Sequence, residues 1–463
     1  MEFNVKNGKC YLREICLEDV AHQYGTPFYL YDLNDIYDKI QSIRDHFGDL
    51  IKLYYAIKAN SNLELLKSIR AKVDGLDISS YGEMEQSLLA GYSPQQLSFA
   101  GPGKTFKELE KAIKSGIGII SVESLREMED IRRLSLDLNT KIDIAIRVNP
   151  TLLIKEFAIK MGGQATQFGI DEEKLGEAID YLRSNEEHLN FKGIHVYSGT
   201  QCLNEEALVK NVDNVLEIAK RLENEYDLEC AWINLGGGFG VSYHDNQKLN
   251  IEKIGEGVNP VRNSSGALNP VRDLSLNGIN PAGIILKSNP AAEQRGIISN
   301  GVKKSIKSYR KFTKGIPSFV FELGRYLVTE AGIYVTKVVS YKESRGKLYF
   351  ILDGGMNHHL AASGNFGQIL KKNFIVKNLS NPDGEIKVCN LVGPLCTTLD
   401  ILGRDIPVES PRVGDAIAFL NSGSYGFTSS PLFFLGHETP VELLATSDEI
   451  KIIRNRKKLT DLN

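Results

Sequence analysis

A lysine at the end of an apolar strand is the residue of this sequence whose placement most favours covalent chemistry. Lys58 lies in the segment YYAIKAN, directly after the apolar run at residues 53–57, where packing gives a lysine no reason to be. A desolvated lysine loses its proton more readily, and the free amine forms a Schiff base with an aldehyde. Position alone also fits a solvated loop lysine, so the interpretation depends on the residues that the fold places beside it.

Short apolar runs alternate with amphipathic segments from about residue 53 to residue 323. The eight runs lie at residues 53–57, 75–79, 97–100, 118–122, 142–148, 191–197, 230–236 and 318–323. Eight strands, each followed by a helix or its equivalent, are what a closed parallel (β/α)8 TIM barrel requires. An open doubly wound sheet more usually has fewer strands and a glycine fingerprint after the first. The pattern therefore predicts an α/β fold built on a TIM barrel.

The chain changes character after residue 325, where strand-like runs are separated by turns and helical periodicity is rare. Residues 326–463 are predicted to form a β-rich domain with Greek-key-like connections, and the hairpin-like strands of residues 1–26 to join it. Residues 27–325 would form the barrel. Within them, residues 258–301 contain NPVR twice and lack strand or helix periodicity. This composition predicts a flexible inserted element, with a functional lid as the alternative.

Polar residues and glycines follow the ends of several predicted strands. They are Asp77 after the second strand, Arg147 after the fifth, His195 and Ser198 after the sixth, Gly236, Gly237 and Gly238 after the seventh, and Glu322 and Arg325 after the eighth. Each of them alone fits a capping or turn residue. Because the carboxyl ends of barrel strands meet at one rim, their joint placement predicts an active site there.

The glycine run indicates a phosphate-binding loop. Successive glycines let backbone amides approach an anion closely, and the loops after the seventh and eighth strands bind phosphate in many barrels. Taken alone, three glycines fit a tight turn equally well. Together with a Schiff-base lysine they predict a phosphorylated aldehyde, for which pyridoxal 5'-phosphate is the economical candidate.

The composition of the chain restricts the remaining classes of function. Its 463 residues carry a formal net charge of −3 without a basic block, so neither nucleic acid nor a membrane surface is an expected partner. No apolar run is long enough to span a bilayer, and the first residues contain no segment typical of a secretion signal. Six cysteines at irregular spacing, without a CxxC pair, argue for a reducing cytoplasm and against a metal site.

Six motifs resemble those of one enzyme family. YYAIKAN, HVYSGTQ, NLGGGFG, ELGR, GPLCTTLD and SGSYGF occur in the order found in the fold type III pyridoxal-phosphate decarboxylases of the diaminopimelate, ornithine and arginine type. The resemblance extends over nearly the whole chain outside residues 258–301. It implies an amino acid carboxy-lyase.

The resemblance also implies roles for the residues at the rim. Lys58 would carry the cofactor as a Schiff base, His195 would stack on its ring, and Glu322 would keep the pyridine nitrogen protonated so that the ring accepts electrons. The remaining cofactor contacts would come from Asp77, Ser198, Gly236, Gly237, Gly238, Arg325 and Tyr425, with the serine, the glycines and the arginine around the phosphate.

For the substrate, the resemblance implies contacts from Arg147, Asp353, Cys396 and Tyr425. Cys396 would protonate the substrate carbon after carbon dioxide has left. A small buried hydrophobe is the commoner role of a free cysteine. In this family Cys396 and Tyr425 would come from the neighbouring subunit, which implies a homodimer with shared active sites.

Two positions distinguish this chain from the diaminopimelate decarboxylases that it resembles. Those enzymes continue the motif DGGMN with an arginine and a tyrosine that hold the substrate, and a glutamate follows their catalytic cysteine. Here HHLAASGNFG follows Asn357, and Thr397 follows Cys396. Because an unpaired buried charge costs several kcal/mol, these losses argue against diaminopimelate, which is kept as the alternative substrate.

The segments GPLCTTLDILG, HHLAASGNFGQ and SYGFTSSPLFFLGH resemble a branch of the family that includes decarboxylases of carrier-protein-bound glutamate and decarboxylases associated with exosortase gene clusters. The resemblance implies an amino acid substrate tethered to a carrier protein. A noncatalytic pyridoxal-phosphate-binding protein and an amino acid racemase are the alternatives. The β-rich domain and the Cys396 motif favour the decarboxylase over the first, and His195 with the glycine run favours it over the second.

Overall fold

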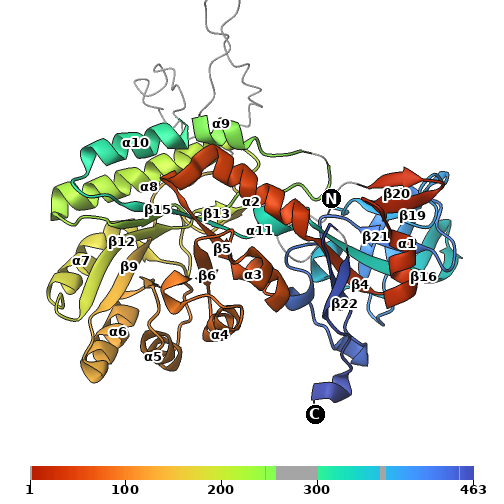
Figure 1. Cartoon of the computed structure of the whole chain (residues 1–463), viewed down its shortest axis with the longest axis horizontal. Coiled ribbons are helices and arrows are strands. Elements are labelled where there is room, and N and C mark those ends of the chain that lie inside the picture. The colour runs from red at the N-terminus through yellow and green to blue at the C-terminus, as the bar shows by residue number, and fades with distance from the viewer. Residues whose placement is uncertain (1–2, 246, 257–300, 365–371, 448, 463) are drawn as a thin grey trace, which may run out of the picture.

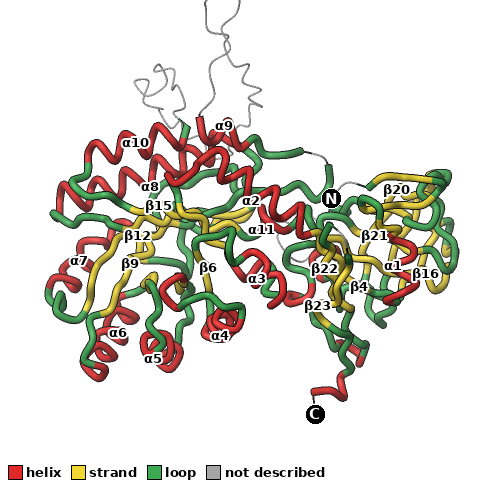
Figure 2. Tube along the Cα trace, in the orientation of Figure 1, coloured by secondary structure: helices red, strands yellow, loops and turns green. Residues whose placement is uncertain are grey.

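The chain folds into a barrel and a β-rich domain that lie side by side (Figure 1). The computed structural model describes residues 3–245, 247–256, 301–364, 372–447 and 449–462. Figure 2 shows helices around the barrel strands, whereas the β-rich domain consists mostly of strands and loops. The predicted TIM barrel followed by a β-rich domain is confirmed.

Eight parallel strands close into the barrel, because the last strand in the pairing order returns to the first. In that order they are β9 (Ile142–Asn149), β12 (Leu189–Val196), β14 (Trp232–Asn234), β15 (Ser318–Leu323), β5 (Lys52–Ala56), β6 (Gly75–Ile78), β7 (Leu97–Phe99) and β8 (Ile119–Val122). The eight predicted strands coincide with these within two residues at either end. They read as continuous apolar runs because one face lies inside the barrel and the other lies beneath helices.

Helices follow the barrel strands on the outside. They are α3 (Leu63–Ile69), α4 (Tyr81–Leu89), α5 (Phe106–Lys114), α6 (Leu125–Leu138), α7 (Leu175–Arg183), α8 (Glu205–Tyr226), α9 (Ile251–Glu256), α10 (Val302–Phe312) and α11 (Arg325–Val328), and α2 (Leu33–Phe47) precedes the first strand. The side chains of Ser80, Thr105 and Ser124 cap α4, α5 and α6 by accepting a hydrogen bond from the amide three residues later. Such caps satisfy amides that have no partner within the helix, which explains where these helices begin.

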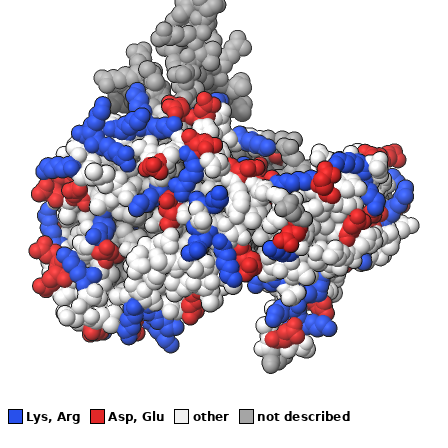
Figure 3. Space-filling model, in the orientation of Figure 1, with Lys and Arg blue, Asp and Glu red and all other residues white. Residues whose placement is uncertain are grey.

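Helix α10 shows how the sequence pattern orients a barrel helix. Ile306 and Tyr309 are buried, whereas Lys304, Lys307 and Lys311 on the other side are exposed. Figure 3 shows Lys and Arg gathered over this helix, while both signs of charge are interspersed on much of the same face. No helix in the described part of the chain has the length and apolar character needed to cross a membrane.

The expected insertion at residues 258–301 lies, except for Gly301, outside the described residues. The helices on its two sides, α9 and α10, contact each other through an ion pair of 2.5 Å between Glu256 and Lys303. The two ends of the segment therefore lie close together.

A nine-stranded sheet forms most of the β-rich domain. Its main path is β20 (Ile401–Glu409), β19 (Ile386–Val392), β17 (Lys347–Leu352), β16 (Gly332–Ser344), β4 (Phe28–Asp32), β22 (Val441–Ala445) and β23 (Ile450–Arg454), and β21 (Ala416–Phe419) joins β16 to β18 (Val376–Asn378). Strand β4 is buried on both faces, with Tyr29 and Tyr31 in one apolar cluster and Phe28 and Leu30 in another. It therefore occupies the centre of this domain.

The position of β4 corrects the expected start of the barrel at residue 27. The strand pairs with β16 and β22, so residues 28–32 belong to the β-rich domain. Because FYLYD is apolar on both faces, its periodicity could not indicate which sheet it joins.

The N-terminal strands also differ from the expected arrangement. Strands β1 (Asn4–Lys6), β2 (Lys9–Leu12) and β3 (Ile15–Cys16) form a sheet of their own, followed by α1 (Leu17–Tyr24). Among the described residues they share no strand pairing with the β-rich domain. They contact it through side chains instead, since Cys10 and Leu12 pack in the same cluster as Phe28 and Leu443.

Shorter elements complete the fold. The loops near the rim contain β10 (Ile159–Lys160), β11 (Ile170–Asp171) and β13 (Gly199–Thr200). Single 3₁₀ turns lie at Gly48–Leu50, Ile57–Ala59, Pro94–Gln96, Glu172–Lys174, Leu360–Ser363, Phe427–Ser429, Phe434–Gly436 and Leu459–Leu462. The turn at Ile57–Ala59 directly follows β5 and contains Lys58.

Candidate active site

The carboxyl ends of the barrel strands surround a cavity of about 400 Å³. Six of the residues predicted at the rim line it: Lys58, Asp77, Arg147, His195, Glu322 and Arg325. The other lining residues are Ser79, Ala100, Gly101, Pro102, Gly103, Ile159, Met161, Phe168, Tyr197, Thr200 and Tyr425. The fold therefore brings side chains from distant parts of the sequence to one place.

Lys58 extends from the turn after β5 toward an acid on the neighbouring strand. Its Nζ atom lies 3.4 Å from Oδ2 of Asp77 and 5.6 Å from the centre of the Tyr197 ring. Burial acts to lower the pKa of Lys58, but the carboxylates of Asp77 and Glu322 outweigh it and the pKa is raised. Atom Oδ1 of Asp77 is buried and has no hydrogen-bond partner among the described residues. Lys58 is thus held as an ammonium by an acid that has one oxygen left for a ligand.

His195 and Glu322 form a buried pair across the barrel. Nε2 of His195 lies 3.2 Å from Oε2 of Glu322, which also accepts a hydrogen bond of 3.0 Å from the side chain of Asn234. Burial acts to raise the pKa of Glu322, but His195, Lys58 and other nearby positive charges bring it below its ordinary value. Glu322 is therefore a carboxylate, which suits it to hold a proton on a neighbouring ring nitrogen.

The glycine run after β14 has a packing reason of its own. A Cβ atom on Gly237 would lie 2.2 Å from the carbonyl oxygen of Glu322, and one on Gly238 would lie 2.4 Å from that of Gly199. Gly236 would place a Cβ 2.5 Å from the carbonyl oxygen of Val196. Only glycine therefore lets this loop pass between β12 and β15.

One end of the cavity extends past Gly238, Gly324 and Arg325 toward Thr200. Arg325 is buried, and its Nε atom has no hydrogen-bond partner among the described residues. A buried guanidinium beside glycine backbone suits a phosphate. Among the described lining residues of this extension, only Gly238 comes from the predicted run of three glycines.

Ser198 is not among the residues that line the cavity, so its expected phosphate contact stays a prediction. Its buried hydroxyl donates a hydrogen bond of 2.5 Å to Oδ1 of Asn211 on α8. Thr200, two residues later, lines the cavity instead. The side chain of Ser198 therefore supports the strand end from behind.

Tyr425 lines the cavity of its own chain, which corrects the expectation that the neighbouring subunit supplies it. Its amide donates a hydrogen bond of 2.8 Å to the carbonyl oxygen of Ala59, next to Lys58. The guanidinium of Arg325 lies 4.5 Å from the centre of its ring. The loop after β21 in the β-rich domain thus closes one side of the barrel cavity.

Cys396 lies outside this cavity. It is exposed on the loop after β19, and Asp400 fixes that loop by accepting a hydrogen bond of 2.8 Å from the amide of Leu395. The same carboxylate accepts a bond of 2.7 Å from Met356 in the motif DGGMN. The two motifs therefore lie side by side and present an exposed thiol on a fixed loop.

Asp353 is held within the β-rich domain. One carboxylate oxygen accepts from the side chain of Thr336 at 2.6 Å, and the other accepts from Thr26 at 2.5 Å. It does not line the barrel cavity of its own chain, so the expected substrate contact stays a prediction.

Several residues around the cavity were not predicted from the sequence. Tyr197 and Asn234 lie inside the motifs HVYSG and NLGGG, where their place at a strand end indicates a position at the rim. Glu123, which pairs with Arg147 at 2.7 Å, follows β8 in the same way. Lys104 lies in a loop, and no local signal distinguishes it from a solvated lysine.

Comparisons with known proteins agree with this geometry. Residues 33–271 match the family model described as the pyridoxal-binding domain of pyridoxal-dependent decarboxylases. The chain is 35% identical to an L-glutamyl acyl-carrier-protein decarboxylase from Niallia circulans, over 96% of this chain and 94% of that protein. It is 28% identical to the diaminopimelate decarboxylase of Aquifex aeolicus, over 98% and 94% of the two chains.

A solved structure shows the same architecture. The crystal structure of diaminopimelate decarboxylase from Helicobacter pylori, complexed with L-lysine, is 26% identical in sequence and superimposes with a TM-score of 0.76, covering 96% of this chain and 98% of that one. With a lysine at the end of a barrel strand, a buried carboxylate opposite it and the buried Arg325 beside glycine backbone, the chain belongs to the family of pyridoxal-dependent decarboxylases.

Proposed function

We propose that this pyridoxal-phosphate enzyme decarboxylates an amino acid whose far end is joined to a carrier protein. The identity of 35% to a decarboxylase of glutamyl carrier protein, against 28% to a diaminopimelate decarboxylase, supports this substrate. The main support for a carrier-bound substrate is the segment after DGGMN. Its described residues 358–364 contain no charged side chain that could bind the distal charged groups of a free amino acid.

Two histidines occupy that segment, and neither is suited to bind a carboxylate. Nε2 of His358 lies 2.8 Å from the carbonyl oxygen of Glu438, and Nε2 of His359 lies 2.9 Å from the hydroxyl of Ser422. Burial lowers the pKa of His358 to about 4 and that of His359 to about 3. Both are neutral near pH 7, so they add no positive charge for a distal carboxylate.

The cavity fits the cofactor on three grounds. Its volume of about 400 Å³ lies in the usual range of small-molecule sites. Oδ1 of Asp77 and Nε of Arg325 are buried polar atoms without a hydrogen-bond partner among the described residues, and a bound ligand would supply these hydrogen bonds. Glu322 is a carboxylate that can keep a pyridine nitrogen protonated. When bound, pyridoxal phosphate supplies an electron sink for the charge left by carbon dioxide.

Different residues of this chain would then hold different parts of the cofactor. Lys58 would hold the cofactor covalently through its side-chain amine. His195 supports the ring, and its position is fixed by Glu322 at 3.2 Å and by the hydroxyl of Ser121 at 3.1 Å. Arg325, with Tyr425 against its guanidinium, holds the phosphate end.

We also propose that two copies of the chain complete each other's sites. Protonation of the substrate carbon needs an acid, and Cys396 lies outside the cavity of its own chain on an exposed loop. A partner subunit that presents Cys396 to this cavity would supply it. The exposed position of Cys396 outside its own cavity supports such a homodimer.

The carrier proposal is tested by measuring carbon dioxide release from matched substrates. Glutamate loaded on the phosphopantetheine arm of an acyl-carrier protein is compared with free L-glutamate, diaminopimelate and ornithine. We expect release from the loaded carrier to exceed that from each free amino acid. Rapid release from diaminopimelate would instead identify the alternative, lysine-forming reaction. Loss of chirality without carbon dioxide would identify a racemase, and cofactor binding without either reaction would identify a noncatalytic protein.

A further inference from the structure

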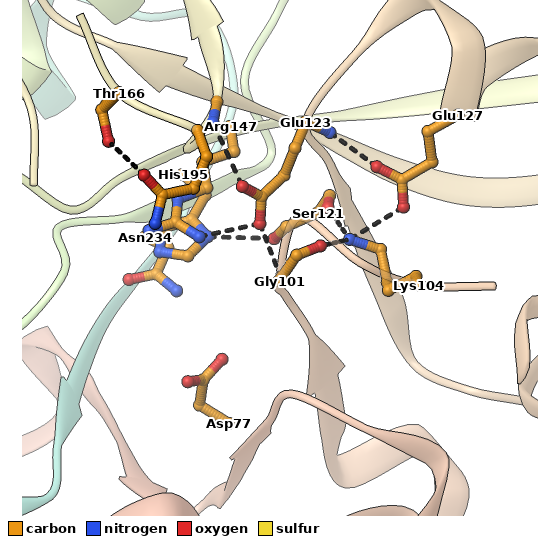
Figure 4. Close-up of polar contacts among 12 residues, drawn as sticks. Asp77, Gly101, Lys104, Ser121, Glu123, Glu127, Arg147, Thr166, His195 and Asn234 are labelled. Carbon is orange, nitrogen blue, oxygen red and sulfur yellow. Dashed lines mark hydrogen bonds and ion pairs between the residues drawn. The ribbon is translucent and has the colours of Figure 1, made fainter.

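Four buried charges lie at the cavity wall, near His195 (Figure 4). They are Glu123 and Arg147, which pair at 2.7 Å, and Lys104 and Glu127, which pair at 2.8 Å. Only Arg147 lines the cavity. The cluster as a whole is neutral, and it connects three loops at the carboxyl ends of neighbouring strands.

Glu123 holds three separate parts of the wall with one carboxylate. Its Oε1 atom accepts hydrogen bonds from the guanidinium of Arg147 at 2.7 Å and from the amide of Gly101 at 2.6 Å. Its Oε2 atom accepts one of 3.1 Å from the amide of Gly169. Gly101 and Phe168, next to Gly169, line the cavity with Arg147. The position of Glu123 therefore determines where all three segments meet the cavity.

Lys104 supports this arrangement from behind and extends it to His195. Its side chain is not exposed, and its Nζ atom donates to the carbonyl oxygens of Gly101 at 2.6 Å and Ser121 at 3.0 Å. Ser121 in turn contacts Nδ1 of His195 through its hydroxyl at 3.1 Å. Glu127 accepts a bond of 2.8 Å from the amide of Glu123. Both the arginine and the histidine of the cavity thus depend on one cluster.

Stability alone does not account for such a cluster. Removing charges from water costs more than a pair regains unless the geometry is very good, and apolar residues of similar volume often stabilise a core equally well. A network of satisfied hydrogen bonds does hold side chains in one arrangement. Reactions that depend on orientation benefit from that arrangement.

We propose that Glu123 is a positioning residue for decarboxylation, which acts through Arg147 and the cavity segments at Gly101 and Phe168 without touching the substrate. Arg147 lies above the Phe168 ring at 4.8 Å from its centre, so the guanidinium is fixed from two sides. This inference rests on decarboxylation in this cavity and does not depend on a carrier-bound substrate.

The first test is a double-mutant cycle on the holoenzyme with Glu123→Gln, Arg147→Gln and the combined variant. Turnover is expressed per mole of bound cofactor, with the best substrate of the unmodified enzyme. Glu123→Gln should lower kcat/KM by ~10²-fold, as expected for misplacement of a reacting group by about 1 Å. If Glu123 acts through Arg147, kcat/KM of the combined variant should be no lower than that of the less active single variant. Losses that multiply in the combined variant would overturn the proposal.

Glu129→Gln is the matched control. Glu129 lies on the same helix as Glu127 and pairs with Arg132 at 2.8 Å, away from the cavity. Its loss should leave turnover per bound cofactor unchanged. An equal loss in Glu123→Gln and Glu129→Gln would show a general effect of removing an acid from this helix region.

A readout without substrate separates this proposal from the choice of substrate. The induced circular dichroism of the bound cofactor reports the asymmetry of its surroundings, and it should change in Glu123→Gln and stay unchanged in Glu129→Gln. Thermal unfolding is recorded on the same samples. A Glu123→Gln enzyme with lower thermal stability but normal dichroism and normal turnover per bound cofactor would make Glu123 a structural residue only.

Discussion

Lys58 and Lys104 lie at the same rim of the barrel, but Lys104 has a full set of polar partners and Lys58 does not. Lys104 is wholly buried, and three acceptors surround its ammonium at 2.6, 2.8 and 3.0 Å. Lys58 has one carboxylate at 3.4 Å and the face of Tyr197, and 39% of its side chain is exposed. Burial therefore does not by itself make a lysine reactive. A complete set of partners makes the ammonium a permanent part of the fold, whereas an incomplete set leaves the nitrogen available to a ligand.

The strongest test of this contrast is Lys58→Ala. We expect it to abolish decarboxylation and covalent attachment of the cofactor, because no other lysine lines the cavity among its described lining residues. Folding should be retained, because burial raises the pKa of Asp77 to about 7 and this acid can take up a proton when Lys58 is lost. Borohydride reduction of the unmodified holoenzyme, followed by peptide mapping, should find the cofactor on Lys58. Cofactor found on Lys104 would reverse the comparison.

Replacing Cys396 by Ala tests whether the Lys58 site is complete within one chain. A general acid typically contributes ~10² to 10⁴ in rate, so turnover should fall by that order while the absorption of the bound cofactor persists. Mixing this variant with Lys58→Ala should restore activity, because one of the two sites in a heterodimer then has both residues. Normal turnover of Cys396→Ala would make the cysteine a surface residue.

Lys104→Met should lower the stability of the fold, whereas Lys58→Ala should abolish decarboxylation. It leaves the buried carboxylate of Glu127 without its cation, which costs ~3 to 5 kcal/mol of unfolding free energy. Burial already raises the pKa of Glu127, and losing Lys104 would raise it further. A carboxyl whose pKa is raised by folding stabilises the folded state at low pH and loses this as pH rises.

The loss of unfolding free energy in Lys104→Met should therefore become smaller as the pH is lowered from mildly alkaline to mildly acidic. Urea unfolding at several pH values measures it, and the cofactor should still attach to Lys58 in the folded fraction. A deficit independent of pH would show that Glu127 is not the group left unpaired.

The smallest effect is expected from shortening the segment between α9 and α10. Excision of residues 258–301, which joins Gly257 to Val302, should change stability by about 1 kcal/mol or less, because closure entropy varies slowly with loop length. The described ends support this, since Glu256 and Lys303 already form an ion pair of 2.5 Å. Unfolding curves and carbon dioxide release of the shortened protein measure the outcome. A shortened protein that binds the cofactor but loses one substrate would instead give the segment a role in substrate binding.

The barrel was predictable because its signals are local. Strands buried on both faces read as apolar runs, and the ends of parallel strands share one rim, so Lys58, Asp77, His195, Glu322 and Arg325 were placed together correctly. Strand β4 also reads as an apolar run, but nothing in FYLYD distinguishes the sheet of the barrel from that of the β-rich domain. Its partners, β16 and β22, lie near the other end of the sequence.

The supporting residues of the site could not be predicted in this way. Lys104 reads as a loop lysine, and its burial arises only because the loop folds onto Glu127 and Ser121. Glu123 reads as a residue before a helix cap, and its role depends on amides at Gly101 and Gly169. The resemblance assigned Tyr425 to the neighbouring subunit, whereas it lines the cavity of its own chain, because that placement depends on how the two domains meet.

The central place of β4 in the β-rich domain has a consequence for synthesis of the chain on the ribosome. The strand emerges before the barrel, yet its partners begin only at Gly332 and Val441. Until then an apolar strand with two open edges must wait beside a barrel that is still being made, and such edges pair readily with other chains. The nascent protein therefore needs protection from aggregation until β16 and β22 have been made, and a chain that stops before β22 leaves one edge of β4 open.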